Sequence, residues 1–118
     1  MAEENYEDRR SVPRVNVVCP VLLKGAVKEY HGLTRNISLG GAAIEVSEEL
    51  PEKKQYDIEL VLPDGPEVKC GCEIMWAMRQ EKIYMYGLRF ISVGMFRKMK
   101  LKSYIDRKVN NESRNSRP

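Results

Sequence analysis

Three arginines stand close together near the start of the chain: Arg9, Arg10 and Arg14. Guanidinium groups repel one another unless an anion lies between them. Each can pair with two phosphate oxygens, bind the O6 and N7 edge of guanine, or stack on an aromatic plane. Pro13 fixes φ, so we expect an extended segment and no helix here. The spacing Arg10-x-x-x-Arg14 would let two arginines converge on one ligand, although alone it is more typical of a solvated basic leader.

A second polar segment has the sequence Asn36-Ile37-Ser38-Leu39-Gly40-Gly41. Asn and Ser bond to nearby backbone and paired glycines permit positive φ, so the segment is predicted to be a turn. Such a turn would display an amide and a hydroxyl beside glycine backbone, with room for a flat or anionic ligand. The Asn36 side chain can donate and accept along a guanine edge. Alone, the segment is equally consistent with a simple connection between strands.

Trp76 is a secondary candidate, because an exposed indole ring could serve as a platform for a guanine base. It alternates with Ile74 and Met78, which slightly favours a position in the core. Three further arginines could add positive charge near a phosphate, although each is more simply a surface residue: Arg35, Arg79 and Arg89.

The sequence offers little for catalysis or for binding a metal. Its one histidine, His31, has no marked nucleophile near it, and no Gly-rich loop is followed by Lys and Ser/Thr. Cys70 and Cys72 would share one strand face, but with a single histidine a zinc site lacks ligands. We predict that the protein is not an enzyme, binds no metal, and keeps these thiols and Cys19 reduced in the cytoplasm.

The chain has 118 residues, which suits one domain with a single core. Its net charge of +3 does not indicate a general binder of polyanions. No apolar run approaches the ~20 residues that a membrane span needs. We expect residues 1–8 to form a flexible leader and residues 111–118 a disordered polar tail.

Apolar and polar residues alternate along most of the chain, which is typical of strands. The alternation predicts six strands, at residues 15–23, 27–35, 42–46, 56–62, 68–78 and 84–90. Beyond them, Leu101, Tyr104, Ile105 and Val109 recur at helical spacing. We therefore predict an all-β fold: a six-stranded antiparallel β-barrel over residues 14–91, capped by a C-terminal helix over about residues 94–110.

Together, the two polar segments are far more specific than either alone. An Arg-x-x-x-Arg segment before the first strand, followed by Asn-x-Ser-x-x-Gly between the second and third, resembles the PilZ domain family. Gly87-Leu88-Arg89-Phe90 is similar to the Gly-x-x-Phe end of that family's last barrel strand. Ile74-Met75-Trp76 is similar to its Val-x-Trp strand. The resemblance predicts a PilZ domain over residues 9–109.

PilZ domains are small β-barrels that bind the bacterial second messenger cyclic di-GMP, and they are receptors without catalytic activity. The resemblance implies that Arg10 and Arg14 hold guanine edges and phosphates, with Arg9 as a helper beside them. Asn36 and Ser38 would contact the base or the ribose-phosphate backbone. No cofactor is implied beyond this ligand. Because no output domain is attached, the signal would pass to a separate downstream protein.

The glycines of the second segment have simpler implied roles. Gly41 would permit the turn and a close approach, and Gly40 would serve the geometry only. Asn36 stands where many family members have Asp. A neutral amide offers one acceptor to the guanine edge where a carboxylate offers two, so we expect a lower affinity.

Two other functions remain open. A nucleic-acid-binding barrel could use the arginines and the basic helix, with an affinity that falls steeply with salt and does not distinguish guanine nucleotides. A PilZ-like barrel without ligand could serve only as an adaptor between proteins. The intact motif residues argue against the adaptor.

Overall fold

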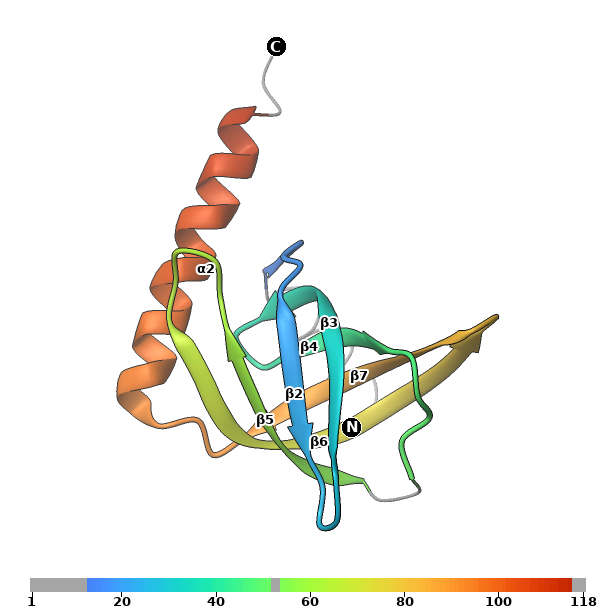
Figure 1. Ribbon diagram of the computed structural model, residues 1–118. Coiled ribbons are helices and arrows are strands. Elements are labelled where there is room, and N and C mark those ends of the chain that lie inside the picture. Colours follow the sequence, from blue (N-terminus) through green and yellow to red (C-terminus); the bar gives the residue numbers. More distant parts are fainter. Residues whose placement is uncertain (1–12, 52–53, 116–118) are drawn as a thin grey trace, which may run out of the picture.

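The computed structural model describes residues 13–51 and 54–115, with side chains up to residue 111. In chain order its elements are β1 (Arg14–Val15), β2 (Pro20–Lys24), β3 (Glu29–Ser38), β4 (Gly41–Val46), β5 (Gln55–Val61), β6 (Glu67–Gln80), β7 (Ile83–Ile91) and α2 (Met95–Asn115). Figure 1 shows the strands wrapped into a barrel with α2 beside it.

The strands form one antiparallel sheet in the order β1-β3-β2-β5-β6-β7-β4, and a further pairing of β3 with β4 closes it. The predicted six-stranded barrel with one C-terminal helix is thereby confirmed, with the two-residue β1 as a short addition on β3. Closure pairs the backbone groups that an open sheet would leave exposed at its edges. The outer surface can therefore carry binding residues on a rigid wall.

The barrel interior is filled by the apolar residues that alternate along the strands. Leu23, Ile44 and Ile58 are almost completely buried, and they belong to the same cluster as Leu88 and Cys72. Burying one such side chain stabilises the fold by about 1.5–3 kcal/mol relative to leaving it in water. The alternation along the sequence therefore reports correctly which face of the barrel wall is inside.

The first predicted strand, residues 15–23, is divided into β1 and β2. Thr34 on β3 lies under the connection and is fully buried. Its hydroxyl donates to the Val17 carbonyl at 2.5 Å and accepts from the Cys19 amide at 2.9 Å. In a third bond, the Thr34 amide donates to the Cys19 carbonyl at 2.9 Å. At residues 16–19 these bonds replace the regular hydrogen bonds between paired strands. They thereby fix the position of β1.

Helix α2 covers one end of the barrel, beside β1 and β6 (Figure 1). Leu101, Tyr104 and Ile105 are buried in the same cluster as Val15, as their helical spacing predicted. The helix continues to Asn115, into the segment expected to be a disordered tail. Between Met95 and Pro118 the sequence has no glycine and no proline, so neither residue stops the helix earlier. Over its described length α2 is too polar to cross a membrane.

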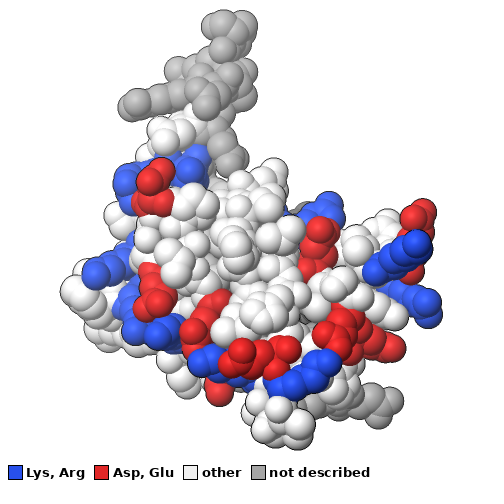
Figure 2. All heavy atoms as spheres, viewed as in Figure 1, with Lys and Arg blue, Asp and Glu red and all other residues white. Residues whose placement is uncertain are grey.

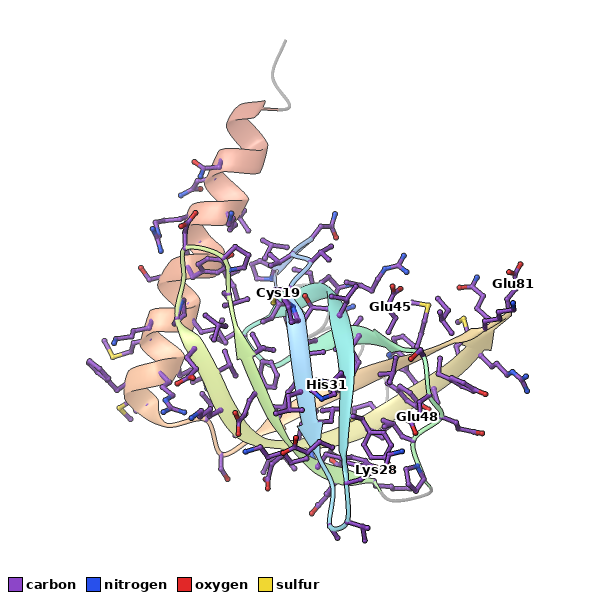
Figure 3. All side chains as sticks on the ribbon, viewed as in Figure 1. Cys19, Lys28, His31, Glu45, Glu48 and Glu81 are labelled. Carbon is purple, nitrogen blue, oxygen red and sulfur yellow. The ribbon has the colours of Figure 1, made fainter. Side chains whose placement is uncertain are left out.

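The β6–β7 hairpin projects beyond the barrel (Figure 1), and Glu81 lies at its tip, far from Lys28 at the β2–β3 turn (Figure 3). The pairing of β6 with β7 shifts register between Ile74 and Trp76. Trp76 is therefore 38% exposed and Met78 52% exposed, so the expectation that alternation places them in the core is wrong. A bulge adds one residue and reverses which face the following side chains occupy.

Candidate ligand-binding surface

The two polar segments meet where β1 pairs with β3. Arg14 lies opposite Ser38, and Val15 lies opposite Ile37. Val15 and Ile37 are fully buried, so their neighbours Arg14 and Ser38 lie on the outer face of the barrel. Asn36 precedes Ser38 by two residues and shares this face. Arg9 and Arg10 lie outside the described residues.

A row of register partners crosses four strands from Asn36. Asn36 on β3 pairs with Ala43 on β4, Ala43 with Gly87 on β7, and Gly87 with Trp76 on β6. A Cβ atom on Gly87 would lie 2.0 Å from Nε1 of Trp76, so the indole ring lies directly against the β7 backbone. An amide and a partly exposed indole are thus joined by two very small residues. The partly exposed indole offers a planar face on which a base can stack.

The second polar segment, residues 36–41, has a different backbone structure from the turn that we expected. Asn36 and Ser38 belong to the end of β3, and Gly41 begins β4, so the bend itself is short. Among the described glycines none has positive φ, so the expectation that Gly40 and Gly41 supply it is wrong. Gly41 is required for another reason: its Cβ would lie 1.9 Å from the Leu88 carbonyl oxygen of β7.

Gly40 has different surroundings from its neighbour. A Cβ added there would meet nothing within 4 Å, and the residue is exposed. Its carbonyl accepts a hydrogen bond from the Phe90 amide at 2.8 Å, which ties the bend to β7. The Ser38 hydroxyl lies 3.4 Å from the Gly41 carbonyl, a long contact that leaves its lone pairs available. The bend therefore presents its outer side to solvent while its backbone is fixed.

The secondary arginines are engaged within the protein. Arg35 pairs with Glu45 at 2.7 Å, and Arg89 pairs with Glu73. Arg79 lies over the Tyr84 ring, 5.7 Å from its centroid. Among the described residues, no carboxylate forms an ion pair with Arg14. Unlike Arg35 and Arg89, Arg14 therefore keeps a positive charge that no described carboxylate pairs with.

The sequence did not reveal how close these groups lie, because strand register is set by contacts between distant residues. Gly87 had a signal in the Gly-x-x-Phe pattern, but Ala43 had none. A surface hollow of about 400 Å³ lies elsewhere, at the β2–β3 turn beside Tyr56 and Ile91. It is lined by Lys24, which pairs with Glu59 at 2.5 Å, and it contains none of the motif residues.

A match to the model of the PilZ domain family covers residues 8–107. The chain belongs to this family of cyclic di-GMP receptors, whose domain is typically non-catalytic. The expected family membership is confirmed. No curated protein matches the sequence.

Solved structures show the same fold. The inhibitor of motility MotI/DgrA of Bacillus subtilis superposes with a TM-score of 0.76 at 16% identity, over 92% of this chain and 54% of that one. The PilZ domain of YcgR from Escherichia coli, solved with c-di-GMP, has a TM-score of 0.71 at 13% identity. The match covers 92% of this chain and 97% of that one. The PilZ domain of CeSA from a cellulose-synthesizing bacterium has a TM-score of 0.56 at 17% identity. The match covers 78% of this chain and 93% of that one. The chain spans about half the length of MotI/DgrA.

Proposed function

We propose that this chain is a bacterial cyclic di-GMP receptor that passes the signal to a separate partner protein. Arg10 and Arg14 bind the guanine edges and phosphates, and Arg9 assists them. The polar side chains of Asn36 and Ser38 contact the base or the ribose-phosphate backbone. The ligand carries two phosphates and two guanines, and guanidinium groups are suited to both.

One observation carries the proposal: Arg14 and Ser38 are direct register partners on the outer face. Two segments that are remote in the sequence are thereby joined at one edge of the barrel wall. Arg10 precedes Arg14 by four residues, a span of at most about 14 Å for extended chain. Both arginines can therefore reach a ligand that contacts Ser38.

Trp76 and the glycines complete the proposed surface. The indole lies at the far end of the row that begins at Asn36, so it offers a planar ring on which a guanine can stack. Stacking of a base on an aromatic ring is worth about 1–3 kcal/mol. Gly41 contributes by letting β4 and β7 approach, and Gly40 leaves open space beside the bend.

Calorimetric titration with cyclic di-GMP tests the assignment. We expect Arg14→Ala and Arg10→Ala each to weaken binding at least about tenfold, because a hydrogen bond to a charged group is worth ~1.5–3 kcal/mol. The matched control is Arg107→Ala, which removes the same charge from an exposed position on α2. Near-unchanged affinity in both arginine variants would remove the basis of the proposal.

Asn36→Asp provides a test in the opposite direction. A carboxylate can accept from both N1–H and N2–H₂ of guanine, so the variant should bind about fivefold more tightly. Weaker binding would contradict the placement of Asn36 on a guanine edge.

Two competitors separate the rival functions. We expect neither GTP nor single-stranded DNA to displace cyclic di-GMP at moderate salt. Preferential binding of the DNA, with a steep loss as salt rises, would instead favour a nucleic-acid-binding barrel. Absence of binding to all three would favour the adaptor.

A further inference from the structure

Helix α2 carries an apolar cluster on the side that faces away from the barrel. Met95, Phe96 and Met99 are 80%, 70% and 66% exposed. At 3.6 residues per turn they lie on the face opposite Leu101 and Ile105, which are buried against the barrel. Adjoining large apolar side chains that face water indicate an interaction surface more often than isolated ones do.

The orientation of this face is fixed by the contacts on the other side of the helix. Arg97 donates to the Lys69 carbonyl of β6 at 3.0 Å, which secures the first turn. Farther along, the Tyr104 ring packs so closely on Gly65 that a Cβ there would lie 2.4 Å from it. The helix cannot roll to bury its apolar cluster. The cluster is therefore preorganised for a partner, which lowers the entropic cost of binding.

Positive charge surrounds the cluster. The first turn of α2 holds no acidic residue. Lys102 pairs with Asp106 at 2.9 Å, whereas no described carboxylate pairs with Lys98 or Lys100. The Lys100 ammonium lies 4.5 Å from the Phe96 ring centroid. The ammonium groups of Lys98 and Lys100 can therefore attract the carboxylates of an anionic partner.

A basic hollow continues the surface along the helix. It measures about 320 Å³ and is lined by Lys100, Ser103 and Arg107 from α2 and by residues 64–66 of the β5–β6 turn. Its two cations face the single carboxylate of Asp64, so the hollow keeps a positive excess. In Figure 2 blue side chains recur among white ones, with a few red ones beside them, down the α2 side of the molecule. From Met95 to Arg107, the apolar and basic parts together extend about 18 Å along the helix.

We propose that this surface docks an acidic amphipathic helix of a partner protein. Apolar side chains of the partner pack on Met95, Phe96 and Met99, and its carboxylates follow one to three turns later at Lys100 and Arg107. This arrangement places a helix against a groove beside another helix, with anchors at helical spacing. The surface is defined as the α2 docking surface.

Other occupants fit these observations less well. A second copy of the chain would bring the unpaired Lys98 and Lys100 against themselves, and like charges repel. A helix that lies on a membrane needs an apolar face along its length. Here the outward face becomes polar after Met99, with Asp106 and Asn110 exposed.

The test begins with a display library of random peptides about 16 residues long, roughly four helical turns. The library is selected on the full chain without cyclic di-GMP, so the outcome is independent of the proposed receptor function. We expect enrichment of peptides with apolar residues at helical spacing followed by Asp or Glu. An enriched peptide is then titrated by fluorescence anisotropy at low and moderate salt.

Two variants and two matched controls locate the binding. M95S/F96S/M99S and K100E/R107E should each weaken the peptide at least about tenfold, as expected for central interface residues. The first control, V27S/V61S/M75S, removes three exposed apolar residues from other surfaces. The second, K54E/K82E, reverses two exposed charges elsewhere. Circular dichroism and thermal unfolding verify that every variant is folded, and both controls should bind as the parent does.

Three results would overturn the proposal. The first is selection of peptides without acidic enrichment, or equal binding by parent and variants. The second is binding to vesicles of phosphatidylcholine and phosphatidylglycerol that depends on the same side chains, while the peptides do not bind. The third is concentration-dependent dimerisation that M95S/F96S/M99S abolishes.

Discussion

The two halves of β6 differ although they form one continuous strand. In the first half, Val68 and Cys72 are buried and their neighbours face outward, as an alternating pattern requires. After the register shift at Ile74, every residue from Met75 to Gln80 is exposed. The first half is part of the barrel wall, and the second half extends beyond it with Trp76 at its start.

The buried half of β6 contributes to stability, whereas the exposed half is available for binding. The buried half gains its stability from apolar side chains that share the core. The exposed half has no core to fill, so its side chains are free to serve a ligand or a partner. Both halves look alike in the sequence, because Ile74, Trp76 and Met78 continue the spacing of the buried residues.

Truncation of a core residue should show the largest contrast. Ile58, which pairs with Cys70 of β6, is fully buried. Ile58→Ala should lower the free energy of unfolding by about 2–5 kcal/mol, since it leaves a cavity. Met78→Ala in the exposed half should change it by less than about 0.5 kcal/mol. Urea unfolding measures both, and comparable losses would show that the hairpin belongs to the core.

Gly41 and Gly40 offer a sharper contrast over two adjacent positions. Gly41→Ala places a Cβ 1.9 Å from a β7 carbonyl oxygen, so the strands must separate. We expect a loss of about 1–3 kcal/mol in the free energy of unfolding. Gly40→Ala meets open space and should be tolerated within about 0.5 kcal/mol. If both substitutions were equally tolerated, the close approach of β4 and β7 would be disproved.

Gly87→Ala tests the position of Trp76. The new methyl group would overlap the indole, so the ring must move away from the β7 backbone. We expect a shifted tryptophan emission and, under the proposed function, about tenfold weaker binding of cyclic di-GMP. Trp76→Ala should weaken binding similarly without straining the strand. Unchanged emission in Gly87→Ala would show that the indole does not lie on Gly87.

The buried Cys72 thiol should make the stability of the protein depend on pH. Burial raises its pKa from 9.0 to about 12. The unfolded chain ionises this thiol first, so its contribution to stability is complete below pH 9.0 and is lost as the pH rises toward 12. Between these values the free energy of unfolding should fall more steeply in the parent than in Cys72→Ala. Equal slopes in urea titrations at several pH values would contradict this.

The sequence predicted the barrel well because alternation reports a local property, the face that each side chain occupies. The prediction failed at Trp76 and Met78 because a single bulge moves the following side chains to the other face of the strand. The alternation of residue types in the sequence continues unchanged across the bulge. The prediction also gave the wrong reason for Gly41, whose constraint comes from a strand remote in sequence. The pairing of Arg14 with Ser38 depends on register, which the Thr34 contacts fix and which no local pattern encodes.

The central claim is that cyclic di-GMP lies on the outer face between Arg14 and Trp76. Amide and indole chemical shifts of the full chain, recorded during a titration with the ligand, test it most directly. We predict the largest changes at Arg14, Asn36, Ser38 and the Trp76 indole, with little change at the β2–β3 turn. Saturation that shifts the β2–β3 turn and leaves these four residues unmoved would contradict the claim.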